Sequence, residues 1–171
     1  PAYRIALLTN GSLCSDPDVI EDIRGADLII PTLSSAFQET YEAIHRPHPS
    51  LTVESHIEGL KALRRAFSGR IWLEVFLVPP LNTTPEELLA LREVIHGIRP
   101  DRIQLNMLDR PGTEGWVTPL QPEEGSRIET FFAGTGIPVD LIAISPCQAA
   151  PERKGLPRTM ILQTLMRRPC T

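Results

Sequence analysis

The chain has 171 residues and a mass of 19.0 kDa, which suits one domain and is too little for two ordinary ones. Seventeen Lys and Arg against 21 Asp and Glu give a net charge of -4, which disfavours non-specific nucleic acid binding. No apolar run approaches the ~18 to 20 residues of a membrane span. The cysteines Cys14, Cys147 and Cys170 are too far apart for a disulfide framework or a metal cluster. The composition predicts a soluble, cytoplasmic protein, and the start at Pro1 without Met indicates a piece of a larger one.

Short apolar segments alternate with amphipathic segments along the chain, a pattern typical of βα units with a parallel sheet. The predicted strands are residues 4–8, 27–30, 71–78, 102–106 and 139–144. A closed eight-stranded barrel usually takes about 250 residues, and only four βα units and a terminal strand are found here. The fold is therefore either a small open α/β sheet or a partial TIM-type (βα) barrel fragment with parallel strands.

The helices between these strands have readable starts. Ser15 is the predicted cap of a first helix, and Thr84 caps a later helix with Pro85 in its first turn. Apolar residues three and four apart predict further helices over residues 36–44, 53–67, around 128–132 and around 160–166. Two prolines in residues 45–49 exclude helix between the first and second of these.

Polar residues gather just after the predicted strands, where parallel α/β folds bind ligands. The first such groups are residues 9–12, then Thr32, Ser34 and Ser35, then residues 79–84. Each has a simpler reading, because residues 9–12 have the composition of a turn and the serines and threonines are good helix caps. Both readings stay open at this stage.

Three polar residues lie inside predicted strands. Gln104 and Asn106 alternate in one strand and so point the same way, and Glu74 shares a side with Trp72 and Phe76 in another. A carboxylate there either faces solvent at an edge or points into a functional cavity, and the alternation favours the cavity. The four histidines lack metal-ligand spacing and are predicted to be surface or packing residues. Dinucleotide, phosphate-loop, nucleophile-elbow and zinc-protease motifs are absent from the sequence.

Five segments, taken in order, resemble the radical S-adenosylmethionine (SAM) superfamily. They are residues 6–13 (ALLTNGSL), 26–33 (ADLIIPTL), 44–49 (IHRPHP), 72–75 (WLEV) and 100–106 (PDRIQLN). The match is closest to predicted iron-sulfur oxidoreductases related to the wyosine-synthesis and pyruvate-formate-lyase-activating enzymes. The resemblance implies that residues 1–150 are the C-terminal part of a (βα)6 barrel. Residues 151–171 would be a helical tail that resembles the start of a winged-helix appendage.

The resemblance also implies cofactors, SAM and a 4Fe-4S cluster, for the parent protein. The family's C-x3-C-x2-C cluster motif is absent from this chain, as is its Gly-Gly-Glu segment, so no metal ligands are assigned here. The catalytic residues stay unknown. The positions that match SAM-contacting or barrel-lining residues of the family are Thr9, Asn10, Thr32, Glu74, Gln104, Leu105 and Asn106. Ser34 is also named as a cofactor-binding position, although it stands where many members of the family have Asp.

The expected function is thus part of a radical SAM iron-sulfur oxidoreductase that binds SAM at the carboxyl ends of its strands, with this chain alone inactive. Its substrate is not predicted. The alternative is a non-catalytic α/β binding or scaffold module. Because the first strand lacks a neighbour on one side, an exposed edge or a homodimer through that edge is also predicted.

Overall fold

The structure is a computed structural model that describes residues 3–107, 114 and 117–142. The strands are β1 (Ala6–Thr9), β2 (Leu28–Pro31), β3 (Arg70–Leu77), β4 (Arg102–Met107) and β5 (Val139–Ile142). The helices are α1 (Pro17–Ile23), α2 (Gln38–His45), α3 (Val53–Ala66), α4 (Pro85–Ile98) and α5 (Pro122–Ala133). Each of these elements was predicted, with small shifts at the ends. The predicted helix near 160–166, the rest of the tail, Cys147 and Cys170 lie outside the described residues.

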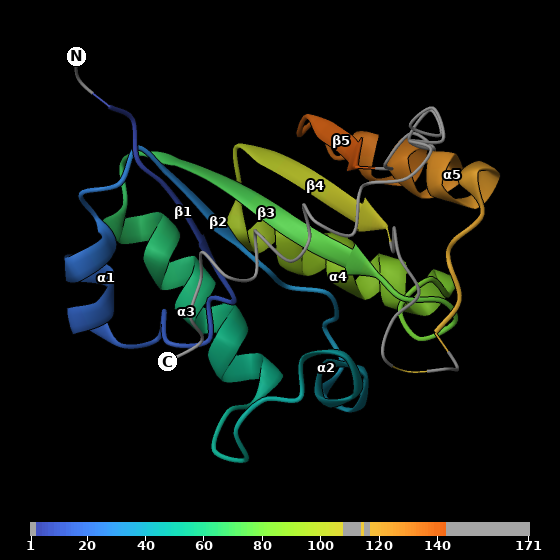
Figure 1. The fold of residues 1–171 in the computed structure, drawn as a ribbon, viewed down its shortest axis with the longest axis horizontal. Helices are drawn as coiled ribbons and strands as arrows, with labels where there is room; N and C mark the ends of the chain where they lie inside the picture. Colours follow the sequence, from blue (N-terminus) through green and yellow to red (C-terminus); the bar gives the residue numbers. More distant parts are fainter. Residues whose placement is uncertain (1–2, 108–113, 115–116, 143–171) are drawn as a thin grey trace, which may run out of the picture.

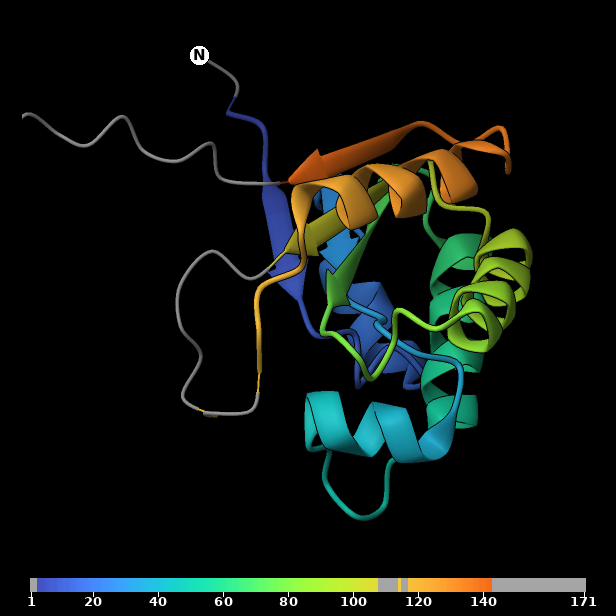
Figure 2. The same cartoon turned by 90° about the vertical axis from the view of Figure 1, so that its right-hand side faces the viewer.

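The five strands are parallel and follow one another across the sheet in the order β1-β2-β3-β4-β5 (Figure 1). Right-handed crossovers that all step in one direction place every helix on the same face of a sheet. Figure 2 shows the result, with α3, α4 and α5 arranged around the outer side of a curved sheet. The fold is therefore an open α/β sheet of the partial TIM-barrel type, as predicted, and its inner face carries no helix within the described residues.

The core fills the space between the sheet and the outer helices. Alternation along β3 sends Leu73 and Val75 to the helix side, where they are fully buried. Leu63 of α3 and Leu91 of α4 meet them there and are equally buried. The periods of two and 3.6 residues in the sequence thus produce one continuous core. In the part of the chain described, no helix is long and apolar enough to cross a membrane.

Strand β1 is an edge of the sheet, as the sequence predicted. Among the described strands it pairs with β2 alone, and its Leu8 is 73% exposed on the inner face. A long apolar side chain on an unpaired edge is a surface that another strand or chain tends to cover. The homodimer through this edge stays a prediction.

One predicted cap is wrong. The first helix is capped by Asp16, whose side chain accepts from the Asp18 backbone N–H, and not by Ser15. Asp and Ser are about equally good caps, so the sequence does not separate two adjacent candidates. Thr84 does cap α4, accepting from the Glu87 N–H.

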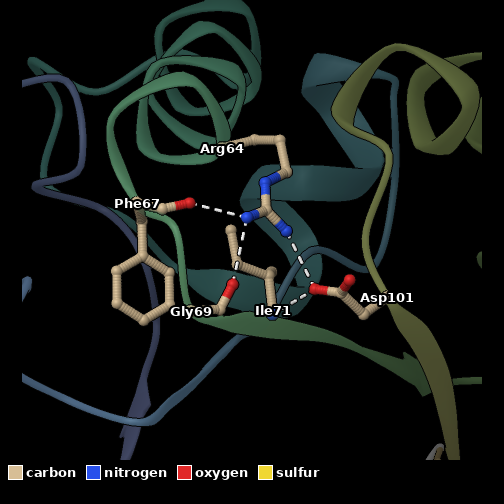
Figure 3. Close-up of polar contacts among 5 residues, drawn as sticks. All are labelled: Arg64, Phe67, Gly69, Ile71 and Asp101. Carbon is tan, nitrogen blue, oxygen red and sulfur yellow. Dashed lines mark hydrogen bonds and ion pairs between the residues drawn. The ribbon is translucent and has the colours of Figure 1, made fainter.

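A network of hydrogen bonds between α3 and the loop before β4 connects the amino ends of β3 and β4 (Figure 3). Arg64 donates to the Phe67 and Gly69 carbonyls at 2.6 and 3.0 Å and to the Asp101 carboxylate at 2.8 Å. The same carboxylate oxygen accepts from the Ile71 N–H at 2.8 Å. These bonds join the end of α3 to the starts of β3 and β4.

We expect Asp101→Ala to lower the free energy of unfolding by about 1 to 2 kcal/mol, because it leaves the Ile71 N–H and the Arg64 guanidinium short of an acceptor. Urea unfolding followed by circular dichroism measures this. Glu21→Ala, which breaks an exposed ion pair with Arg24, is the control and is expected to cost much less. If the two variants lost equal free energy of unfolding, Asp101 would not stabilise the junction between α3 and the strands.

Candidate functional site

The candidate site centres on Glu74, on the inner face just past the middle of β3. The Thr32 hydroxyl, just past β2, donates to Glu74 Oε2 at 2.6 Å, and the Asn106 amide on β4 donates to Oε1 at 2.9 Å. Residues from three neighbouring strand ends thus orient one carboxylate. A carboxylate has about four acceptor positions, so lone pairs remain for a ligand.

Gln104 extends this polar group along β4. It lies directly opposite Glu74 in the β3–β4 register and is half-buried on the same inner face. No hydrogen-bond partner for its amide is found among the described residues. The amide is therefore available to a ligand, and Trp72 and Phe76 line the same face on either side of Glu74.

Thr9 and Asn10 sit in the turn after β1. The Thr9 hydroxyl oxygen accepts from the Gly11 N–H at 3.1 Å, and Asn10 Oδ1 accepts from the Ser12 N–H and hydroxyl at 3.1 and 2.9 Å. Gly11 has φ of 72°, which favours glycine. Thr9 alternates with the exposed Leu8 and so points to the helix side, while Asn10 is exposed at the rim. The prediction that these residues form a turn is therefore confirmed. In the described residues the amide nitrogen of Asn10 has no hydrogen-bond partner, so it can donate to a ligand.

Ser34 is buried and is not accessible to a ligand from solvent. It is 0% exposed, its N–H donates to His45 Nε2 at 3.2 Å, and its hydroxyl oxygen accepts from the Phe76 N–H at 3.1 Å. Its carbonyl accepts from the Asn82 amide at 2.8 Å. Ser34 does not cap α2, which begins after Phe37. The geometry suits a residue that positions Thr32, and a direct contact of Ser34 with SAM stays a prediction.

Leu105 lies on the other face of β4 from Gln104 and Asn106. Its side chain is fully buried in the core between the sheet and the helices. Contact with an adenine ring from this position would have to come from its backbone. The predicted set thus divides into Thr32, Glu74, Gln104 and Asn106 on the inner face, Asn10 at the rim, and Thr9, Ser34 and Leu105 in supporting positions.

Behind these loops lies a cluster of aromatic and imidazole rings from α2 and α3. His56 is 2% exposed, and its Nδ1 is 3.1 Å from the Tyr41 hydroxyl, while no hydrogen-bond partner is found for Nε2 in the described part of the chain. Burial lowers the pKa of His56 to about 4, helped by His45 and opposed by the Asn10 backbone. Burial likewise lowers the pKa of His45, and the Glu74 charge acts against that shift. Both rings are therefore neutral at pH 7.

The described residues do not fit an iron-sulfur cluster. Cys14 is 1% exposed, and burial raises the pKa of its thiol, whereas a cluster needs several accessible thiolates close together. Across the described ranges, no group of three or more His, Cys, Asp or Glu side chains is placed to hold a metal ion. No step is derived through a cluster in this chain.

Comparison with known proteins gives sequence relatives that are all longer than this chain. No protein-family model matches it. A protein named GTPase Obg from Brachyspira hyodysenteriae is 32% identical over 168 residues, which is 98% of this chain and 25% of that protein. UPF0026 proteins of Methanocaldococcus jannaschii and Synechocystis are 29% and 30% identical over 128 and 125 residues. The chain spans 40% and 43% of their lengths.

Two solved structures share the fold. A domain of pyruvate-formate lyase-activating enzyme from Bacteroides vulgatus superposes with a TM-score of 0.66 at 11% identity, covering 82% of both chains. A radical SAM methyltransferase from Sphaerobacter thermophilus gives 0.64 at 16% identity, covering 80% of this chain and 39% of that one. The chain therefore has the partial-barrel fold found in radical SAM enzymes, and it is similar in sequence to part of the UPF0026 proteins.

Proposed function

We propose that this chain is the part of a radical SAM enzyme that holds the adenosyl end of SAM at the carboxyl ends of its strands. The observation that carries the proposal is the Glu74 carboxylate, fixed by Thr32 and Asn106 on the inner face of the sheet, where the described part of the chain places no helix. The relation to wyosine-synthesis enzymes belongs to the same proposal. GTPase activity is not proposed, since the 171 residues contain no G-x-x-x-x-G-K-[ST] loop.

Each inner-face residue has a role in this proposal. Glu74 accepts hydrogen bonds from ribose hydroxyls, as carboxylates commonly do in nucleotide sites. The amides of Gln104 and Asn10 supply donors and acceptors for the remaining polar edge of the ligand. Ser34 and His45 keep the loop after β2 in place and so hold Thr32 against Glu74. SAM, when bound, would supply the precursor of a hydrogen-abstracting radical, which one-electron reduction of SAM releases.

The proposal is tested with S-adenosylhomocysteine, which carries the same adenosyl group and stays intact. Titration calorimetry on the chain is expected to show binding that Glu74→Gln weakens about tenfold, because a neutral amide replaces a charged acceptor. Glu58→Gln on the exposed side of α3 is the matched control and is expected to bind normally. Absence of binding, or equal binding by both variants, would favour the non-catalytic module instead.

We also expect the chain alone neither to assemble a 4Fe-4S cluster nor to cleave SAM. The cysteine pattern of the family's cluster is missing from the sequence, and Cys14 is buried. Anaerobic reconstitution with iron and sulfide, electron paramagnetic resonance after reduction and an assay for 5'-deoxyadenosine measure this. Ferredoxin reconstituted in parallel is the positive control. A stoichiometric, reducible cluster in this chain would refute the assignment.

The exposed edge of β1 belongs to the same proposal. Leu8 on that edge is exposed, and a strand with one neighbour gains backbone hydrogen bonds by acquiring another. A second copy is the partner proposed for the isolated chain. Small-angle scattering over a concentration series distinguishes the homodimer from a monomer.

A further inference from the structure

A second polar site lies at the opposite, amino end of the strands. A pocket of about 190 Å³ opens there between the segment leading into β1 and the starts of β2 and β3. Its lining residues are Arg4, Ile5, Ala6, Asp27, Leu28, Arg70 and Trp72. Arg70 lies beside Leu28 in the β2–β3 register, and Leu28 lies beside Ala6 in the β1–β2 register. The floor is therefore sheet rather than loop, and its shape is set by strand pairing.

The pocket carries positively charged groups that form no ion pair with the described residues. Arg4 and Arg70 are exposed, and neither guanidinium has an ion-pair or hydrogen-bond partner among the described residues, although the Arg70 backbone N–H donates to the Asp27 carbonyl at 3.3 Å. Asp27, the one carboxylate in the lining, accepts from the Ile5 N–H at 2.7 Å. The whole chain has a net charge of -4, whereas this pocket presents two positively charged guanidinium groups without an ion-pair partner in the described residues. Guanidinium groups bind carboxylate and phosphate oxygens in a forked geometry.

The third element of the pocket is apolar. Ile5, Leu28 and the half-buried Trp72 form a wall beside the arginines. Arg102 of β4 lies 5.3 Å from the Trp72 ring centroid and forms an ion pair with Asp140 of β5. The contact with Arg102 therefore holds the indole in place from the β4 side. A held aromatic ring suits stacking against a planar or apolar group.

We propose that this pocket binds a small organic anion, in which a carboxylate or phosphate meets Arg4 and Arg70 and a planar or apolar body rests on Trp72. The volume is below that of a typical drug-sized site, which matches a compact ligand. Glu74 lies four positions after Arg70 along β3, about 13 Å at the rise of a strand, so the two arginines lie away from the adenosyl site. This second site stands independently of the proposed function.

The test titrates the chain with benzoate and phenyl phosphate, one for each anion chemistry, and follows amide and indole shifts by nuclear magnetic resonance. Saturable binding with a Kd around 1 mM by at least one probe is expected, with shifts at Arg70 and Trp72. The double variant Arg4→Gln/Arg70→Gln is expected to weaken that binding at least about tenfold, because both charged donors are lost. Whichever probe binds more tightly identifies the anion chemistry.

Arg65→Gln is the matched control, because Arg65 is an exposed arginine on α3 away from this pocket. It is expected to bind the probe like the unchanged chain. Binding of S-adenosylhomocysteine, measured on the double variant, is expected to stay the same and separates this site from the proposed adenosyl site. Three results would overturn the proposal: no saturable binding of either probe, unchanged binding by the double variant, or an equal loss in Arg65→Gln.

Discussion

Replacing Asn82 with alanine is expected to lower the free energy of unfolding by about 3 to 5 kcal/mol, the sum of several buried polar groups left unsatisfied. Asn82 is 1% exposed in the loop between β3 and α4. Its Oδ1 accepts from the Val78 N–H at 2.7 Å, and its amide donates to the carbonyls of Ser34 and Phe76 at 2.8 and 2.7 Å. Alanine supplies none of these three bonds and leaves no route for water to replace them without opening the loop.

Chemical denaturation measures the decrease in the free energy of unfolding, and two further variants serve as comparisons. Thr83→Ala changes the adjacent side chain, which has no hydrogen-bond partner in the described residues, and is expected to cost far less. Asn82→Asp keeps an acceptor for the Val78 N–H but turns a buried carboxylate oxygen toward the Ser34 and Phe76 carbonyls, so a loss at least as large as that of Asn82→Ala is expected. An Asn82→Ala loss no larger than that of Thr83→Ala would show that the loop holds itself together without this side chain.

The same substitution bears on the candidate site. Asn82 joins the loop after β3 to Ser34 in the loop after β2, and Ser35 continues the link by donating to the buried Glu87 of α4 at 2.8 Å. Thr32 lies two residues before Ser34, so its alignment with Glu74 depends on this connection. Polar side chains at the ends of parallel strands can thus build the platform of a site without touching a ligand.

The sequence predicted the fold because the relevant signals are local. The alternation in β3 and the stripe in α4 are each readable within one segment, and the step-by-step order of βα units constrains the sheet. The choice of Asp16 over Ser15 as a cap was not readable, since both residues can accept the same bond. The pattern of apolar segments did not show that the open sheet is of the partial-barrel type, which became clear from the observed strand order β1-β2-β3-β4-β5.

The site was predictable in part for the same reason. Alternation alone places Glu74, Gln104 and Asn106 on one face, and the structure brings Glu74 and Asn106 into contact. The bonds of Ser34 to His45 and Asn82 join residues 11 and 48 positions apart, and no spacing rule connects them. The sequence likewise could not predict the buried Nε2 of His56, for which the described residues offer no hydrogen-bond partner, because its burial depends on how α3 packs against the loop after β1.

His56 is expected to make the protein less stable as the pH falls from about 6.5 to 4. Burial and the neighbouring His45 lower its pKa in the folded protein from 6.5 to about 4, while in the unfolded chain the ring protonates near 6.5. The unfolded state therefore binds more protons in this window, so the stabilisation is complete above pH 6.5 and is lost on acidification. A shift of this size corresponds to about 3 kcal/mol, and the lowered pKa of His45 acts in the same direction.

The measurement is the free energy of unfolding against pH for the unchanged chain and for His56→Gln, whose side chain stays neutral. Carboxylates titrate in the same window in both proteins, so the difference between the two curves isolates the histidine. That difference is expected to shrink, or reverse in favour of His56→Gln, between pH 6.5 and 4. Direct titration of the His56 ring by nuclear magnetic resonance gives a second reading that does not depend on a variant. A His56 pKa near 6.5 in the folded protein would contradict the buried, neutral ring behind the Asn10 turn.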